Sequence, residues 1–315
     1  MWLLLKYTLL YASVLALVAL GGMFAERSGV INIALEGIMV IGGLLGVVMI
    51  NIMNAAGVPV FLGIVATILA SAVAGLAYSS LLAFSAINLK ADQTIGGTAL
   101  NLLATAIAMV MAKRINGTDS PKLAYNSNTN PVLNNLHYSF NIGPLTVNWF
   151  IVVAILALIA AWFILYRSRF GMRLMACGEH PQAADSVGIN VYKMRWAGVL
   201  MSGALGGIGG MAYIVPAVGD WNFEMGVAGM GFLALAVMIF GQWKPLNIAG
   251  AALFFAVFRA MANIFDSIPI LASLGWPKEV YNMMPFLASM VVLAFTSKKS
   301  RAPKAEGIPY DKGSR

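Results

Sequence analysis

Residues 147–166 read VNWFIVVAILALIAAWFILY, a run of twenty positions without a charged side chain. At a rise of about 1.5 Å per residue, a helix of this length crosses the roughly 30 Å of hydrocarbon in a lipid bilayer. A strand of a membrane β-barrel would need only about 10 residues and would alternate polar and apolar side chains. The stretch therefore predicts a transmembrane helix.

Further stretches along the chain have the same apolar character. They are residues 3–24, 33–50, 58–87, 95–112, 196–218, 227–241, 246–265 and 280–296. Of the 315 residues, 60% are hydrophobic and 10% are charged, whereas a soluble domain has about 45–50% and about 25%. We expect an all-α polytopic membrane protein with about 8–10 transmembrane helices. An ordinary soluble enzyme is excluded.

Lysine and arginine set the expected orientation. Five lie in the connection 167–195 and six in the tail 298–315, and the positive-inside rule places both segments in the cytoplasm. The net charge of +8 is thus explained by topology, and we expect contact with lipid and no nucleic acid partner. Residues 1–297 form the expected transmembrane domain. Nine simple spans would put the N-terminus outside, but a broken helix near 23–57 would change this count.

Motifs of nucleotide and catalytic chemistry are missing. The sequence has no Gly-Lys-Ser/Thr phosphate loop, so ATP hydrolysis on this chain is not expected. The run Gly207–Ala212 fits G-x-G-x-x-A, but it lies in an expected span, where such glycines allow close helix packing. One cysteine and two histidines leave little for metal binding. We expect no catalytic residue, metal site or cofactor on this chain.

The first informative polar segment is ERSGVINIALEG, residues 26–37, between two apolar runs. Charged and amide groups beside hydrocarbon are costly and usually face a bundle interior or an aqueous path. Asn32 and Glu36 are four residues apart, so one face of a helix would present both to such a path. In the alternative interpretation the segment is a short cytoplasmic turn, in which Glu26 and Arg27 form a solvated pair and Asn32 caps the next span.

The second informative segment is GEHPQAADSVGIN, residues 178–190, inside the cationic connection. Pro181 suits a first helical position and Gly188 suits a C-terminal cap, which predicts a short helix of about two turns. A small exposed helix between two spans can dock into a groove of a cytoplasmic partner. It can equally be a linker that lies in the lipid headgroups.

These two segments and the tail GIPYDKGSR, residues 307–315, resemble the permease subunits of bacterial ABC importers for nucleosides. That branch belongs to the larger group of sugar and branched-chain amino acid permeases, and the resemblance covers nearly the whole chain. It implies a type II ABC importer-like permease in the bacterial cytoplasmic (inner) membrane. The chain would be a transport subunit that moves substrate by alternating access, and not an enzyme.

The resemblance also implies partners. ATP and Mg would be bound by a separate cytoplasmic ABC ATPase, a second related permease would complete the pore, more often as a heterodimer than a homodimer, and an extracytoplasmic binding lipoprotein would deliver substrate. In this family the cytoplasmic connection is a coupling helix that touches the ATPase. The matching residues are Gly178, Glu179, His180, Pro181, Ala183, Ala184 and Gly188. The loop 113–146 has no family motif.

The candidate substrate pathway combines polar and aromatic side chains, because a nucleoside offers sugar hydroxyls and a flat base. The candidates are Asn32, Glu36, Asn101 and, at the outer mouth, Trp221, Asn222 and Glu224. Alternatively, Asn101 only bonds to a neighbouring helix and Trp221 belongs to an aromatic belt. The competing functions are a ribose-like sugar or branched-chain amino acid permease and, more remotely, a channel or scaffold that works without ATP.

Overall fold

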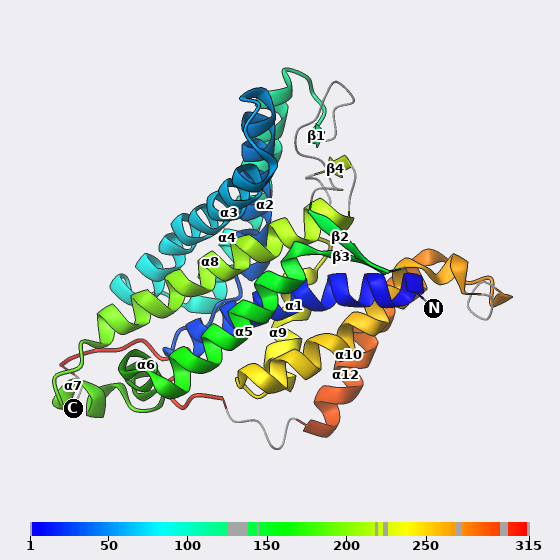
Figure 1. Ribbon diagram of the computed structural model, residues 1–315. Coiled ribbons are helices and arrows are strands. Elements are labelled where there is room, and N and C mark those ends of the chain that lie inside the picture. Colours follow the sequence, from blue (N-terminus) through cyan, green and yellow to red (C-terminus); the bar gives the residue numbers. More distant parts are fainter. Residues whose placement is uncertain are drawn as a thin grey trace.

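The computed structural model describes residues 2–124, 138–143, 145–217, 220–222, 226–268, 273–296 and 302–313. Each of the nine expected spans is helical in it (Figure 1). The helices are α1 (Trp2–Arg27), α2 (Leu35–Ala55), α3 (Val60–Ala83), which continues as the π-helix η1 (Phe84–Asn88), α4 (Gln93–Asn116), α5 (Trp149–Arg167), α8 (Val191–Ala217), α9 (Met230–Phe240), α10 (Pro245–Asn263) and α12 (Lys278–Thr296).

Within the described residues, seven helices are long and apolar enough to cross a membrane. The other two of the nine are α12 and α9, and α9 has only 11 residues, or about 16 Å at 1.5 Å per residue. It cannot cross the hydrocarbon layer alone. The prediction of an all-α polytopic membrane protein is confirmed.

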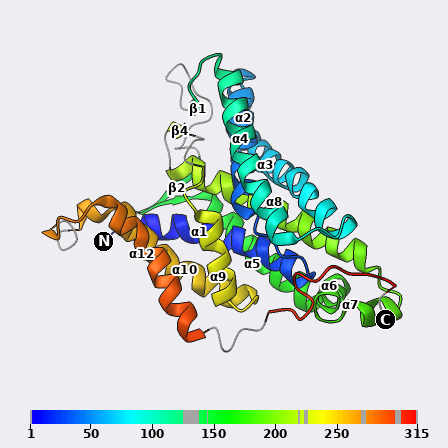
Figure 2. The same ribbon diagram turned by 180° about the vertical axis from the view of Figure 1, so that it is seen from behind.

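Helix α1 is the centre of the bundle. Its residues from Leu10 to Glu26 are buried without interruption, as expected for a helix that is apolar on all sides. Figures 1 and 2 show α2, α3 and α4 grouped on one side of α1, and α9, α10 and α12 on the other. Helices α5 and α8 run beside α1 between these two groups.

Glycines bring three helices into backbone contact. A Cβ added to Gly42 of α2 would lie 2.3 Å from Cα of Gly207 in α8, and one added to Gly75 of α3 would lie 2.2 Å from the carbonyl oxygen of Gly203. Such approaches drive helix association in lipid, where the hydrophobic effect between helices is absent. The glycine-rich run of α8 is therefore a packing seam, as the sequence predicts, and not a nucleotide fingerprint.

The two ends of the bundle differ. At one, the strand end, β1 (Lys122–Ala124) pairs with β4 (Asp220–Asn222), and β2 (Ser139–Ile142) pairs with β3 (Leu145–Asn148), both antiparallel. The short helix η3 (Phe265–Ser267) follows α10 there.

The opposite end, here named the cationic end, holds α6 (Arg169–Glu179), α7 (Pro181–Ser186) and residues 302–313 (Figure 1). Helix α1 starts at the strand end, where Lys6 and Leu10 line a cavity with Ser139 and Thr146. If the cationic end is cytoplasmic, as the positive-inside rule requires, the N-terminus lies outside, which agrees with nine segments.

Candidate functional site

The chain between α1 and α2 is a break in the helical structure that enters the bundle. Residues 28–34 are non-helical and run along the first turns of α4. The N–H of Ile31 donates to Oε1 of Gln93 (2.7 Å), at the start of α4, and the N–H of Gly37 donates to Oδ1 of Asn101 (2.8 Å). Gln93 and Asn101 are separated by about 12 Å along a helix. Helix α2 therefore begins well inside the bundle, as a broken helix near 23–57 predicts.

Asn101 holds this broken segment in place. Its Oδ1 accepts from Gly37, and its Nδ2 donates to the carbonyl oxygen of Ile33 (2.9 Å). The amide oxygen and the NH₂ group of Asn101 thus bond to main-chain groups of Gly37 and Ile33, at the start of α2, where such groups lack partners within the helix. Asn101 therefore bonds to a neighbouring segment, as in the alternative interpretation of this residue. Its role in a substrate pathway stays a prediction.

Asn32 and Glu36 do not share a helix face, so that expectation is wrong. Asn32 lies in the non-helical segment, and its Nδ2 donates to Oγ of Ser202 in α8 (2.8 Å). The N-cap position of α2 is Ala34, so Asn32 is not the cap either. The side chain is fully buried, and its Oδ1 has no hydrogen-bond partner among the described residues.

Glu36 joins two helices that both start inside the bundle. Its Oε1 accepts the N–H of Gly229 (2.8 Å) and its Oε2 accepts the N–H of Gly231 (2.7 Å), at the first turn of α9. A carboxylate there satisfies free N–H groups and complements the positive end of the helix dipole. The Glu36 side chain remains partly exposed, so it can also line a path.

The other predicted pathway residues lie elsewhere. Trp221 and Asn222 are in β4 at the strand end, where they pair in register with Leu123 and Lys122 of β1. Glu224 lies outside the described residues. The structure therefore brings together Asn32, Glu36 and Asn101 around the broken segment and places Trp221 and Asn222 at the strand end.

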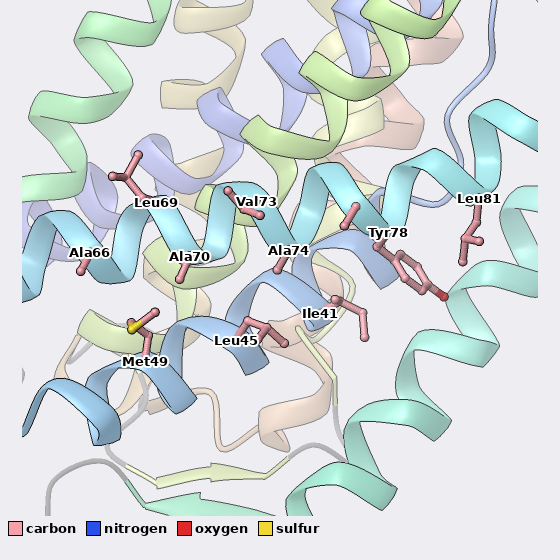
Figure 3. Close-up of a pocket in the computed structure, with 11 residues that line it drawn as sticks. Ile41, Leu45, Met49, Ala66, Leu69, Ala70, Val73, Ala74, Tyr78 and Leu81 are labelled. Atoms are coloured by element: carbon pink, nitrogen blue, oxygen red, sulfur yellow. The ribbon is translucent and has the colours of Figure 1, made fainter. Parts of the chain in front are cut away.

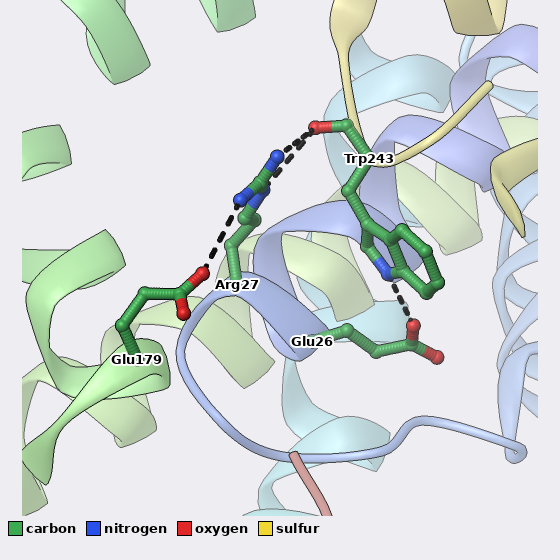
Figure 4. A network of polar contacts seen from close by, with 4 residues as sticks. All are labelled: Glu26, Arg27, Glu179 and Trp243. Atoms are coloured by element: carbon green, nitrogen blue, oxygen red, sulfur yellow. Dashed lines mark hydrogen bonds and ion pairs between the residues drawn. The ribbon is translucent and has the colours of Figure 1, made fainter. Parts of the chain in front are cut away.

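A polar network connects three elements at the cationic end (Figure 4). Arg27, the last residue of α1, donates from Nε and Nη2 to the carbonyl oxygen of Trp243 (3.2 and 3.0 Å). Its Nη1 lies 4.0 Å from Oε1 of Glu179, at the end of α6. Nε1 of Trp243 donates to Oε2 of Glu26 (2.5 Å), which is 3% exposed. The expected solvated pair of Glu26 and Arg27 is therefore wrong.

The backbone of the turn between α9 and α10 is strained where the polar network binds it. Gln242 and Trp243 have φ values of +55° and +53°, in the left-handed region that side chains with a Cβ rarely adopt. Backbone strain of this kind persists where surrounding contacts impose it. The bonds of Trp243 to Glu26 and Arg27 supply such contacts, so the end of α1 fixes the end of α9.

The predicted short helix exists and is α7. Pro181 is at its start and Gly188, with φ of +83°, follows its end, as the sequence indicates. His180, Ala183 and Gly188 are exposed.

Three of the residues expected to touch an ATPase face their own chain. Pro181 and Ala184 are buried and anchor α7 from behind. Gly178 is buried as well, and a Cβ there would lie 2.3 Å from the carbonyl oxygen of Arg27. Val187, which follows the last residue of α7 and which the sequence analysis did not single out, is 74% exposed.

Helix α6 precedes α7 and runs across the bundle, since Figure 1 looks nearly along its axis while α5 and α8 lie in the view. Ser168 caps it by accepting the N–H of Gly171 (3.1 Å). The same hydroxyl donates to the carbonyl oxygen of Ile164 in α5 (2.6 Å). One serine therefore makes the sharp corner between the span and the cationic connection.

An apolar groove lies between α2 and α3 (Figure 3). It has a volume of about 740 Å³ and is lined by Ile41, Leu45, Met49 and residues of α3 up to Leu81. The hydroxyl of Tyr78 is already engaged, because it donates to the carbonyl oxygen of Leu100 (2.5 Å). A polar solute would lose hydrogen bonds here. The candidate functional site is therefore the junction between the starts of α2 and α9, together with the cationic end of the bundle.

The comparisons with known proteins agree with this architecture. Residues 4–294 match the family described as "Branched-chain amino acid transport system / permease component". A guanosine ABC transporter permease of Bacillus subtilis is 39% identical over 98% of this chain and 96% of its own length.

Two nucleoside ABC transporter permeases of Lactococcus lactis are also similar. One is 38% identical over 96% of this chain and 95% of its own length. The other is 27% identical over 53% of this chain and 46% of its own length. The chain belongs to this family of ABC transporter permeases and is a multi-pass transport subunit, not an enzyme.

Proposed function

We propose that this chain is the permease subunit of an ATP-driven importer of nucleosides in the bacterial inner membrane. The observation that carries the proposal is the near-complete match to two permeases whose names specify guanosine and nucleosides. Import of branched-chain amino acids, which the family description names, or of a ribose-like sugar is the second candidate.

The ATPase would dock on α7. His180, Ala183 and Val187 are exposed on this helix, while Pro181 and Ala184 anchor it to the rest of the chain. A helix held from behind presents a rigid surface to a cleft of a partner, which favours docking over a loose lipid anchor. ATP and Mg²⁺ would be bound by that partner, and this chain would hold no cofactor.

A second permease and a binding lipoprotein would complete the importer. Lactococcus lactis has two nucleoside permeases that both resemble this chain, which supports a heterodimeric pore. The lipoprotein would meet the strand end, opposite α7. Trp221, Asn222 and Glu224 stay candidates for the outer mouth of the path.

Alternating access would begin at α7 and reach the broken helices as a movement of rigid bodies. Glu179 lies beside Arg27, Arg27 binds the turn at Trp243, and this turn ends α9. The other end of α9 is bound by Glu36 at the start of α2. A displacement of α7 would thus change the packing of α9 against α2. Glu36 would line the path, and the buried Asn32 would position the segment behind it.

Uptake by cells that lack this chain tests the function. Labelled guanosine, uridine, ribose and leucine are supplied with and without restoration of the chain, before and after ATP depletion. We expect nucleoside uptake that returns with the chain and stops when ATP is depleted. Restored uptake of ribose or leucine alone would overturn the substrate class. Uptake that survives ATP depletion would favour a channel.

A further inference from the structure

Residues 302–313, here named the tail strap, fold back over the cationic end of the bundle (Figure 2). We propose that the tail strap is a second mechanical link, which ties the docking helix α7 to the broken segment 28–34. The proposal rests on the ATPase-driven function above, because it concerns how movement of α7 reaches the pathway.

The middle of the strap, Glu306 and Gly307, lies against the broken segment and the end of α1. The N–H of Gly307 donates to the carbonyl oxygen of Gly29 (3.3 Å). A Cβ added to Gly307, which has φ of +76°, would lie 2.7 Å from Cδ1 of Ile31. The side chain of Glu306 lies beside that of Glu26, the buried carboxyl at the end of α1. Two adjacent carboxyl groups can bond to each other only when one of them holds a proton.

On both sides of Glu306 and Gly307, the strap is bound to α6 and α7. The N–H of Ala305 donates to the carbonyl oxygen of Gly178 (2.8 Å). The ring of Tyr310 is 5% exposed and packs in a small apolar cluster with Cys177 and Ala184. Burial and the neighbouring carboxylate of Asp185 in α7 raise the pKa of its hydroxyl. Tyr310 therefore lies directly behind the surface offered to the ATPase.

A buried cation holds the strap between these two anchors. Arg195 of α8 is 1% exposed, and its Nη1 donates to the carbonyl oxygen of Ile308 (2.9 Å). Its Nε and Nη2 have no hydrogen-bond partner within the described part of the chain. At the edge, Nζ of Lys90 lies 3.2 Å from Oδ1 of Asp311. Removal of the strap would leave a buried guanidinium without its partner, which is costly.

The short length of the strap makes it a stiff connection. Gly307 and Tyr310 are three residues apart, so they can separate by at most about 10 Å. A shift of α7 that moves Tyr310 must therefore move Gly307 and, through it, Gly29. This segment carries Asn32, which is bonded to α8. The strap thus acts in parallel with Arg27 and reaches the broken segment at Gly29.

The test uses the whole importer reconstituted in vesicles, with Tyr310→Ala and Gly307→Val as strap variants and Lys312→Ala as the control at an exposed strap position. We expect both strap variants to assemble with the ATPase and hydrolyse ATP, but to transport at least fivefold fewer substrate molecules per ATP. Lys312→Ala should keep the wild-type ratio. Tyr310→Phe, which keeps the ring and loses the hydroxyl beside Asp185, should fall between them.

Cys177, the only cysteine of the chain, reports strap opening independently of transport. It is buried beside Tyr310, so Tyr310→Ala should speed its reaction with a maleimide in the detergent-purified chain. Faster labelling with an unchanged transport ratio would make the strap a passive cover and overturn the proposal. Loss of ATPase binding in Tyr310→Ala would also overturn it, since the strap would then belong to the docking surface.

The number of substrate molecules transported per ATP is measured with the substrate that the uptake experiment identifies. A wrong substrate class therefore changes the wild-type measurement, whereas a wrong role for the strap leaves Tyr310→Ala equal to the wild type. The two failures are distinguishable. A normal ratio in Gly307→Val, with Cys177 labelled faster than in the wild type, would count against the link at the broken segment.

Discussion

The carboxylate of Glu36 accepts the backbone N–H of Gly229 at 2.8 Å, so the first turn of α2 is bonded to the first turn of α9. Both helices begin inside the bundle, where water cannot satisfy their free N–H groups. The Glu36 carboxylate therefore satisfies two N–H groups at the start of α9 and ties that start to α2.

Replacement of Glu36 by Gln should destabilise the protein. Glutamine has one acceptor oxygen, and its NH₂ group would face the N–H of Gly229 or Gly231. We expect a loss of about 1–3 kcal/mol, since a buried donor is left unsatisfied. Thermal unfolding of the purified chain in detergent measures the loss. Glu279→Gln, at an exposed position in the first turn of α12, is the matched control. Equal midpoints for the two variants would contradict this role of Glu36.

Replacement of Gly42 by Ala should disrupt the seam between α2 and α8. The new methyl group would meet the Cα of Gly207 at 2.3 Å, and a helix backbone cannot yield as a flexible side chain can. We expect a cost of at least about 1–3 kcal/mol, typical of overpacking. Gly250→Ala makes the same change in α10, where nothing lies within 4 Å, and should be neutral. The yield of folded protein after size exclusion compares them, and similar yields would exclude the seam as a stabilising contact.

Arg27 and Glu179 should contribute unequally to stability. Arg27→Gln removes two charge-assisted hydrogen bonds to the carbonyl oxygen of Trp243. We expect this loss to lower the free energy of unfolding by about 1.5–3 kcal/mol. Glu179→Gln removes only an ion pair at 4.0 Å whose carboxylate side chain is 41% exposed, worth about 0–1 kcal/mol. Thermal unfolding should therefore rank Arg27→Gln as the less stable variant. Arg169→Gln, at an exposed position, controls for the lost charge. The reverse order would mean that the bond to Trp243 does not hold the turn.

Replacement of Val187 by Asp should weaken binding of the ATPase. Val187 is 74% exposed at the end of α7, so a carboxylate there disturbs the docking surface without entering the core. We expect at least tenfold weaker binding, or about 1.4 kcal/mol. Leu274→Asp places the same charge at an exposed position beyond η3 and should not affect binding. Co-purification of the ATPase with each variant is the measurement. Full recovery with Val187→Asp would move the docking surface away from α7.

Docking of the tail strap should weaken as the cytoplasmic pH rises. Burial raises the pKa of the Glu306 carboxyl above its ordinary value of 4.5, and the neighbouring Glu26 side chain only partly offsets this increase. A raised pKa in the docked state means that docking is strongest below pH 4.5 and is lost as the pH rises through the raised value. The Glu306→Gln variant carries no titrating group at position 306, so docking of its strap should depend less on pH.

Labelling of Cys177 between pH 5 and pH 8 measures this effect. Burial raises the pKa of this thiol to about 11, so labelling proceeds through the open strap. The ratio of wild-type to Glu306→Gln rates cancels the titration of the thiol itself, and it should increase with pH. A ratio that stays constant over this range would show that Glu306 does not control the strap.

The helices could be predicted from the sequence because each one is indicated by its own residues. A run of apolar residues such as 147–166 must form internal hydrogen bonds in lipid, whichever helices surround it. Pro181 and Gly188 likewise mark α7 by local backbone preferences, and the cap positions were found as predicted.

The site was less predictable because its partners are distant in the chain. Nothing near Glu36 in the sequence indicates that it bonds to Gly229, although the glycines at 226, 229 and 231 were a visible sign of a special backbone before α9. The same holds for Glu26, which chemistry alone would place in solvent and which the indole of Trp243 instead keeps buried. Polarity identified these residues, and only tertiary packing identified their partners.

The bond between Gly29 and Gly307 has a consequence for biosynthesis. The ribosome makes Gly29 before α2 and Gly307 after α12, so every helix from α2 to α12 is synthesised before this contact can form. The entry to α2 therefore waits without its final partner until α12 has been made. A chain that terminates prematurely after α12 would insert fully and still leave the cationic end unfinished, with Arg195 and Cys177 uncovered for quality control to detect.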